Sequence, residues 1–153
     1  AALPLLAAAP DACVVFTLDA RGIDPRAFWG GYAASKAALT ALAATLADEW
    51  ESRANLRINA IVPGPIRSPL RARTHPGEQL EALPLPEMLV PLYLHLLAGQ
   101  PKAESGVVVD ARAWLAGAEG GVFEGRRQLR RGQGLLVADT FSKTREDARQ
   151  DHT

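Results

Sequence analysis

The sequence predicts an α/β fold built around a parallel sheet, on three observations in chain order. A short β-branched run at 12–17 precedes a long alanine-rich helical segment at 32–53, and a second apolar run follows at 56–62. Short continuous apolar runs are typical of strands that are buried on both faces of a parallel sheet. Strand, helix and strand form a βαβ unit with a right-handed crossover. Both strands then end at the sheet edge where open α/β sheets bind ligands.

The first half of the chain supplies these elements. Leu3–Ala9 has the pattern of the last turns of a helix, and because the sequence starts at Ala1 within that pattern, we expect a fragment. Residues 12–17 are the first strand, and a polar loop follows at 18–24. The helix at 32–53 has an apolar stripe at helical spacing, and Asn55 is expected to end it in a left-handed conformation.

The second half adds a bend, a loop segment, a helix and a strand. Two prolines around Gly64 predict a sharp exit from the second strand, with backbone open to a ligand. Residues 69–84 are predicted to be irregular, 87–97 to be an amphipathic helix, and 107–110 to be a third buried strand. Two interpretations of the arginines in this region remain open: a solvated face, or a flap that closes over a substrate or cofactor phosphate. These arginines are Arg67, Arg71 and Arg73.

Composition excludes several classes of function. The apolar content is 48%, and 17 basic residues balance 17 acidic ones, which argues against nucleic acid or an anionic membrane as a main partner. One cysteine rules out an internal disulfide. The histidines lack the spacing of metal ligands, so no metal site is predicted. No continuous apolar run reaches the roughly 18 residues of a membrane span, and we expect a cytoplasmic protein.

A tyrosine and a lysine carry the candidate chemistry. Tyr32 and Lys36 are four residues apart, which places them one turn apart on one helix face. A nearby ammonium favours the phenolate, so Lys36 is expected to lower the pKa of Tyr32 from its usual value of about 10. Such a pair suits general acid–base catalysis. The alternative is an ordinary amphipathic helix start.

Taken in order, the motifs resemble the C-terminal half of the short-chain dehydrogenase/reductase family, in a bacterial branch of unassigned substrate. The resemblance covers residues 1 to about 112. It rests on the tyrosine–lysine pair, the bend after the second strand, the last core strand and two short stretches typical of the branch. The residues are Tyr32 and Lys36 with Ala33, Ala34 and Ser35 between them; Asn59 and Pro63-Gly64-x-Ile66-x-Ser68; Ser105-Gly106-Val107-Val108-Val109-Asp110; Trp29-Gly30; and Pro91-Leu92-Tyr93-Leu94.

The resemblance implies a three-layer αβα, Rossmann-like doubly wound sheet and hydride transfer between NAD or NADP and a small alcohol or ketone. Tyr32 would be the general acid/base, and Lys36 would lower its pKa and hold the nicotinamide ribose. The cofactor-binding loop would include Pro63 and Gly64, with the backbone of Ile66 at the carboxamide. Ser68 would stand where the family has a Thr or Ser near that amide or the phosphates. The 32–53 helix would form a homo-oligomer interface.

One departure from the family concerns the substrate-orienting serine, whose position thirteen residues before Tyr32 holds Asp19. A serine hydroxyl donates a hydrogen bond to the substrate oxygen, whereas a carboxylate only accepts. Asp19 would therefore repel a developing alkoxide and favour the neutral phenol. Two alternatives remain: the Thr17 hydroxyl replaces the serine, or Asp19 pairs with Lys36 or Arg21 and the site is idle.

A second departure is that the N-terminal nucleotide-binding βαβ half is missing, because no strand is followed by a glycine-rich loop and a helix. Residues 113–153 lie outside the resemblance and form an extension of unknown role, partly disordered. Within it, Gly117–Gly121 is expected to be a connector, 126–131 a solvated basic segment, 135–138 a strand and Ser142–Thr153 a frayed end.

Three hypotheses on function follow. The first is a dehydrogenase/reductase present as its catalytic-half fragment, weak or inactive alone. The second is a non-catalytic dimerising or regulatory relative. The third, a nucleic-acid module based on the basic tail, is the least supported.

Overall fold

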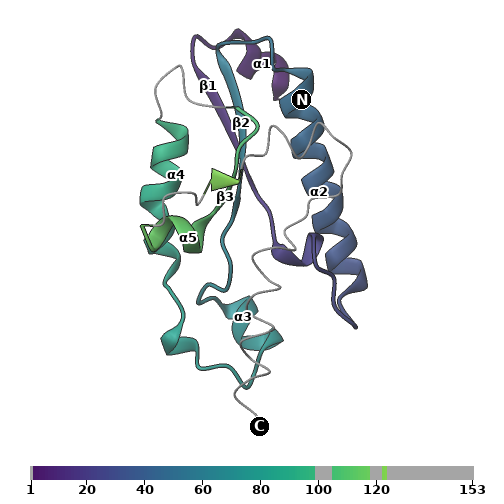
Figure 1. The fold of residues 1–153 in the computed structure, drawn as a ribbon, viewed down its shortest axis with the longest axis vertical. Coiled ribbons are helices and arrows are strands. Elements are labelled where there is room, and N and C mark those ends of the chain that lie inside the picture. The colour runs from purple at the N-terminus through teal and green to yellow at the C-terminus, as the bar shows by residue number, and fades with distance from the viewer. Residues whose placement is uncertain (1, 99–104, 118–121, 124–153) are drawn as a thin grey trace.

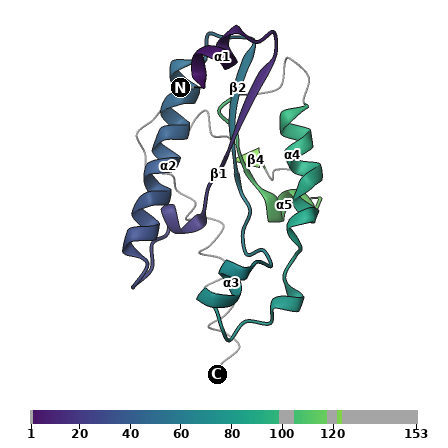
Figure 2. The ribbon, with the colours of Figure 1, turned by 180° about the vertical axis from the view of Figure 1, so that it is seen from behind.

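The computed structural model describes residues 2–98, 105–117 and 122–123, and shows a sheet between two layers of helices (Figures 1 and 2). The sheet has four strands in the order β1 (Ala12–Thr17), β2 (Leu56–Val62), β3 (Val108–Asp110) and β4 (Val122–Phe123). β1, β2 and β3 are mutually parallel, which confirms the predicted α/β class and the strands at 12–17 and 56–62. The third strand starts one residue later than expected. β4 pairs antiparallel with β3, so the sheet is mixed, whereas a parallel sheet was predicted.

The register of β1 and β2 brings their carboxyl ends together. Thr17 pairs with Ile61, and the N–H of Leu18 donates to the carbonyl of Ile61 at 2.8 Å. The chain therefore leaves both strands at one end of the sheet, where α2 also begins (Figure 1). At the next boundary, the side chain of Asn59 accepts the N–H of Val107 at 3.0 Å, which ties β2 to the segment that enters β3.

Helix α2 (Gly30–Glu49) covers one face of the sheet, together with α1 (Leu3–Ala8). The predicted boundaries of 32–53 were wrong at both ends. The helix starts earlier because the carbonyl of Trp29 already accepts the N–H of Ala33 at 2.8 Å. It ends earlier because tight turns replace it after Glu49, with the N–H of Arg53 bonded to the carbonyl of Trp50 at 3.0 Å.

Asn55 does not end this helix in a left-handed conformation. Phe28 is the one non-glycine residue with positive φ in the described part of the chain. The Asn55 amide instead donates to the carbonyls of Ala7, at 3.0 Å, and Ala9, at 2.7 Å. Its polar side chain therefore holds the end of α1 against the start of β2.

Helices α4 (Val90–Leu97) and α5 (Ala111–Leu115) cover the other face, which completes the expected three layers (Figure 2). The predicted helix at 87–97 is shorter because Pro91 lacks the N–H that an α-helix would bond to the carbonyl of Glu87. A 3₁₀ turn, Pro86–Leu89, precedes it. Leu92 and Ile61 meet in the core on this side with no exposed surface.

One segment of the described residues has the length and hydropathy of a membrane span, but a single such segment is weak evidence that a chain crosses a membrane. The 18 residues Leu80–Leu97 have a mean hydropathy of 1.2, and 17% of them are buried. The longest helix within them is α4, Val90–Leu97, because 3₁₀ turns at Leu80–Ala82 and Pro86–Leu89 interrupt the rest. Eight residues of α-helix are about 12 Å long, whereas a bilayer core is about 30 Å thick.

The predicted boundary at residue 112 falls within α5, whose Ala111 is buried in the core beside Leu92. The division into 1–112 and 113–153 stays a prediction. Most of the predicted connector, the basic segment at 126–131, the strand at 135–138 and the end at Ser142–Thr153 lie outside the described residues.

Gly22 sets how closely the 3₁₀ turn Ala20–Gly22 approaches α2, and we expect Gly22→Ala to destabilise the fold. A Cβ there would lie 2.7 Å from the carbonyl carbon of Lys36 and 2.8 Å from the nitrogen of Ala37. The backbone of the turn and that of α2 cannot move apart without a cost, so we expect the free energy of unfolding, measured in urea, to fall by about 1–3 kcal/mol. Gly31 has nothing within 4 Å of its Cβ position, so Gly31→Ala should be neutral or stabilising. Equal effects of the two variants would contradict this account.

Candidate active site

Asp19 lies directly beyond the carboxyl end of β1, where its carboxylate is held in place. It is the N-cap of the turn Ala20–Gly22, and its Oδ1 accepts the backbone N–H of Arg21 at 2.7 Å. Aspartate is a favoured cap because its oxygen satisfies an N–H that the first helical turn leaves unpaired. One carboxylate oxygen is therefore fixed by the backbone, and the other is free to face α2.

Tyr32, in the first turn of α2, meets that second oxygen. Its hydroxyl donates to Oδ2 of Asp19 at 2.9 Å. The contact depends on the close approach at Gly22, since that approach sets the distance between the capped turn and the helix. The structure thus brings together two of the three predicted catalytic residues.

Lys36, one turn further along α2, completes the group. Its Nζ lies 5.7 Å from the centroid of the Tyr32 ring and donates to the carbonyl of Thr17 at 3.5 Å. No ion pair among the described residues includes Asp19, so the alternative in which it pairs with Lys36 or Arg21 was wrong. The guanidinium of Arg21 instead lies over the ring of Trp29, 6.0 Å from its centroid.

The expected direction of the Tyr32 pKa was also wrong. Burial, the hydrogen bond to Asp19 and the charge of that carboxylate together raise the pKa of Tyr32 to about 12. A carboxylate that accepts the phenol proton stabilises the protonated form. Asp19 therefore raises the pKa of Tyr32 as expected, and the lowering expected from Lys36 does not outweigh it.

The Thr17 hydroxyl, which the sequence offered as a replacement for the missing serine, already has a partner. Its Oγ1 lies 2.8 Å from the hydroxyl of Tyr93, which α4 carries from the other helical layer. This pair across the sheet was not predicted. Period-two spacing predicts that Thr17 and Asp19 share one face of the strand. That prediction was wrong, because β1 ends at Thr17 and the two side chains bond to opposite helical layers, Thr17 to α4 and Asp19 to α2.

The predicted cofactor loop leaves β2 at the same end of the sheet, but no hydrogen bond in the described part of the chain joins it to Tyr32 or Lys36. Gly64 has a φ of +72° and is covered by the stem of Arg112, whose Cδ would lie 2.7 Å from a Cβ at Gly64. Pro63 precedes this turn. Ser68 caps α3 (Pro69–Thr74), where its hydroxyl accepts the N–H of Arg71 at 3.1 Å.

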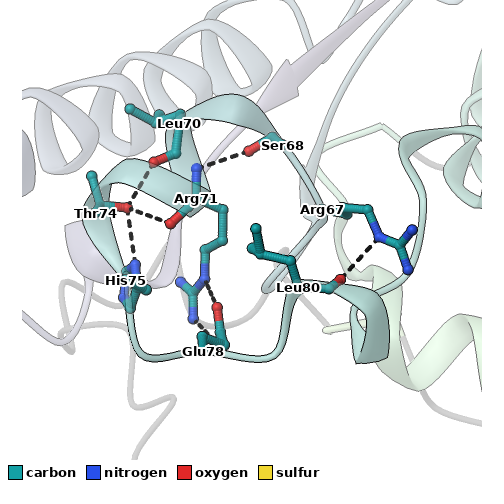
Figure 3. A network of polar contacts seen from close by, with 8 residues as sticks. All are labelled: Arg67, Ser68, Leu70, Arg71, Thr74, His75, Glu78 and Leu80. Atoms are coloured by element: carbon teal, nitrogen blue, oxygen red, sulfur yellow. Dashed lines mark hydrogen bonds and ion pairs between the residues drawn. The ribbon is translucent and has the colours of Figure 1, made fainter.

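Residues 67–84 form a segment, here called the flap, that is bonded mainly to itself (Figure 3). The prediction that 69–84 is irregular was wrong, because Pro69 and the Ser68 cap start α3. Arg67 donates through Nε to the carbonyl of Leu80 at 2.9 Å, and Arg71 forms a two-point ion pair with Glu78. Neither arginine fits the interpretation of a solvated face, since both stabilise the flap; Arg73 is exposed.

Trp29 connects the flap to the start of α2. Its ring lies 5.6 Å from the ring of His75, at the end of α3, and 5.5 Å edge-on from the ring of Tyr32. From the sequence, Trp29 was only a marker of the family branch. An aromatic residue three positions before the tyrosine was a usable signal, but the histidine is distant in sequence and could not be assigned to it.

The described residues fit the nicotinamide end of a dinucleotide. Ile66 is half-buried, and in the described part of the chain its backbone N–H and carbonyl have no hydrogen-bond partner, so both are available to a carboxamide. The Lys36 ammonium has three donors and uses one of them weakly, on Thr17. Among the described residues, no group of three or more potential metal ligands occurs.

The phenol of Tyr32 is expected to titrate near pH 12, and Asp19→Asn should lower its pKa towards 10. Because the folded state raises this pKa, the resulting stabilisation is complete below about pH 10 and is lost as the pH rises through about 12. Ultraviolet absorbance of the phenolate, with Tyr32→Phe to separate the signal of Tyr93, measures it. Asp24→Asn removes a charge from the same loop and should change nothing. An ordinary pKa at Tyr32 would contradict the geometry.

Several bacterial proteins are similar to this chain. The Uncharacterized oxidoreductase YciK of Escherichia coli K12 is 40% identical over 112 residues, which are 73% of this chain and 44% of that protein. A probable 2,4-dienoyl-CoA reductase of Bacillus subtilis strain 168 is 34% identical over 96 residues, 54% of this chain and 38% of that protein. The chain therefore spans less than half the length of these relatives.

Solved structures agree with these relatives. A short chain dehydrogenase of Salmonella enterica serovar Typhi has a TM-score of 0.67 at 39% identity, over 72% of this chain and 45% of the other. A Shigella flexneri 2a short chain dehydrogenase complexed with NADP has a TM-score of 0.66 at 41% identity, over the same shares. The family model of short chain dehydrogenases matches residues 1–79. The resemblance drawn from the sequence is thus confirmed, and this chain belongs to the short-chain dehydrogenase/reductase family.

Proposed function

We propose that this chain is the catalytic half of an NAD(P)-dependent oxidoreductase that acts on a small alcohol or carbonyl substrate in the cytoplasm. The observation that carries the proposal is the grouping of Tyr32 and Lys36 at the carboxyl ends of β1 and β2 in a chain of this family. Parallel α/β sheets bind ligands at this edge. The solved relatives complexed with NADP and NADPH support the choice of cofactor.

Each site residue has a proposed role. Tyr32 exchanges a proton with the substrate oxygen, and Lys36 holds the nicotinamide ribose with the donors that Thr17 leaves unused. The backbone of Ile66 meets the carboxamide, and the Pro63–Gly64 turn shapes the wall of that pocket. Ser68 caps α3 and so sets where the flap starts. When bound, the nicotinamide accepts or supplies the hydride.

A second candidate is a non-catalytic relative that dimerises or regulates. The specific observation in its favour is the hydrogen bond from Tyr32 to Asp19, because a phenol with a pKa of about 12 is a poor acid/base at neutral pH. That the nucleotide-binding half is missing stays a prediction. If it is right, the cofactor's adenosine and phosphates would need residues from elsewhere.

We also propose that α2 forms a homo-oligomer interface. Its outward side carries a smooth row of exposed alanines beside Leu42, which is 48% exposed. Small side chains let a second helix approach closely, and burying them costs little side-chain entropy. The row consists of Ala34, Ala37, Ala38 and Ala41.

Binding of NADH and NADPH, followed by fluorescence anisotropy, tests the proposed function. Lys36→Met should weaken binding at least about tenfold, because it removes the ribose contact. Tyr32→Phe should leave binding intact and reduce any turnover by about 10²–10⁴-fold, the usual contribution of general acid–base catalysis. Arg53→Met, which removes a cation from the other end of α2, is the matched control. Binding of neither cofactor, even by a protein in which the predicted missing half is present, would favour the non-catalytic candidate.

Sedimentation equilibrium tests the interface. Ala38→Arg should shift the chain from dimer to monomer, since it places a long charged side chain in the middle of the alanine row. Ala27→Arg makes the same change at an exposed position before α2 and should leave the mass unaltered. A wild-type chain that is monomeric at high concentration would rule out the α2 interface.

A further inference from the structure

We propose that Asp19 sets the hydrogen-bond polarity of the site, so that it binds an alcohol in preference to the corresponding ketone. The inference rests on the proposed function and names the substrate form that this site takes. In this role Asp19 is a positioning residue, because it acts through Tyr32.

Both carboxylate oxygens of Asp19 already accept a hydrogen bond. Oδ1 already receives the N–H of Arg21, and Oδ2 receives the only hydroxyl proton of Tyr32. The phenol oxygen therefore faces the site with lone pairs and no proton to give. An alcohol can donate to that oxygen, whereas a ketone can only accept.

The other polar groups nearby do not reverse this polarity. The Thr17 hydroxyl is shared with Tyr93 at 2.8 Å, and the Arg71 guanidinium is held by Glu78. Lys36 remains a donor, with one N–H directed to the Thr17 carbonyl, but it does not discriminate, because an alcohol oxygen and a ketone oxygen both accept from an ammonium. At the position of the family's serine, the chain thus offers an acceptor where a ketone needs a donor.

The same arrangement gives Asp19 a task in the oxidation of an alcohol. The substrate O–H bond breaks and its proton passes to the Tyr32 oxygen, while the original Tyr32 proton passes to Oδ2 of Asp19. The carbon-bound hydrogen leaves with its electron pair to an oxidised nicotinamide cofactor. The substrate becomes a carbonyl compound, and the carboxylate is the final proton acceptor.

Ligand-observed NMR of the full chain, without cofactor, tests the polarity with cyclohexanol and cyclohexanone as probes. The wild-type chain should bind cyclohexanol more tightly by about three- to tenfold, the range that one hydrogen bond supplies. Asp19→Ser restores a hydroxyl donor and keeps a favourable N-cap. It should abolish or reverse the preference, and so should Tyr32→Phe.

Asp24→Ser removes a carboxylate from the same loop and should behave as wild type. Asp19→Asn provides a second variant with an amide donor, should the serine variant fail to fold. Equal binding of the probes to the wild type, no binding of either, or a preference that survives Asp19→Ser would each overturn the inference. Binding of NADH and NADPH bears on the proposed function alone, since the probe preference is measured without cofactor.

Discussion

The hydrogen bond between Tyr32 and Asp19 is the interaction on which the rest of the site depends. It exists because Gly22 lets a capped turn press against α2, and because β1 and β2 end in register. The same carboxylate that organises the loop raises the pKa of the phenol. Asp19 therefore has both a structural role, as the cap of the turn, and a chemical one, as the partner of Tyr32.

The fold was largely predictable because its signals are local. Buried strands such as Ala12–Thr17 and Leu56–Val62 are continuous apolar runs, and the long helix between them carries its own propensity. The errors lie where a distant partner decides. Asn55 has the composition of a helix stop, yet its amide serves the end of α1, 46 and 48 positions away. The antiparallel pairing of β4 likewise depends on β3 and not on its own two residues.

The proximity of Tyr32, Lys36 and Asp19 was predicted from the sequence, but the pKa shift of Tyr32 was not. The four-residue spacing placed Tyr32 and Lys36 on one helix face. Asp19 was identified from its position thirteen residues before Tyr32, where the family has a serine. Spacing alone could not decide which neighbour controls the phenol, because that depends on distances of a few ångströms. The same limit applies to Arg67 and Arg71, whose partners in the flap come from a turn that the sequence did not predict.

The internal bonding of the flap has a consequence for how a ligand meets it. Arg67 and Arg71 fix its shape from within (Figure 3). The ring of His75, at the end of α3, lies 5.6 Å from the ring of Trp29. A loop that is already ordered has little conformational entropy left to lose when it covers a bound molecule. If the flap covers a ligand at the proposed site, affinity there would be determined mainly by the contacts that the ligand makes, because ordering the flap would cost little.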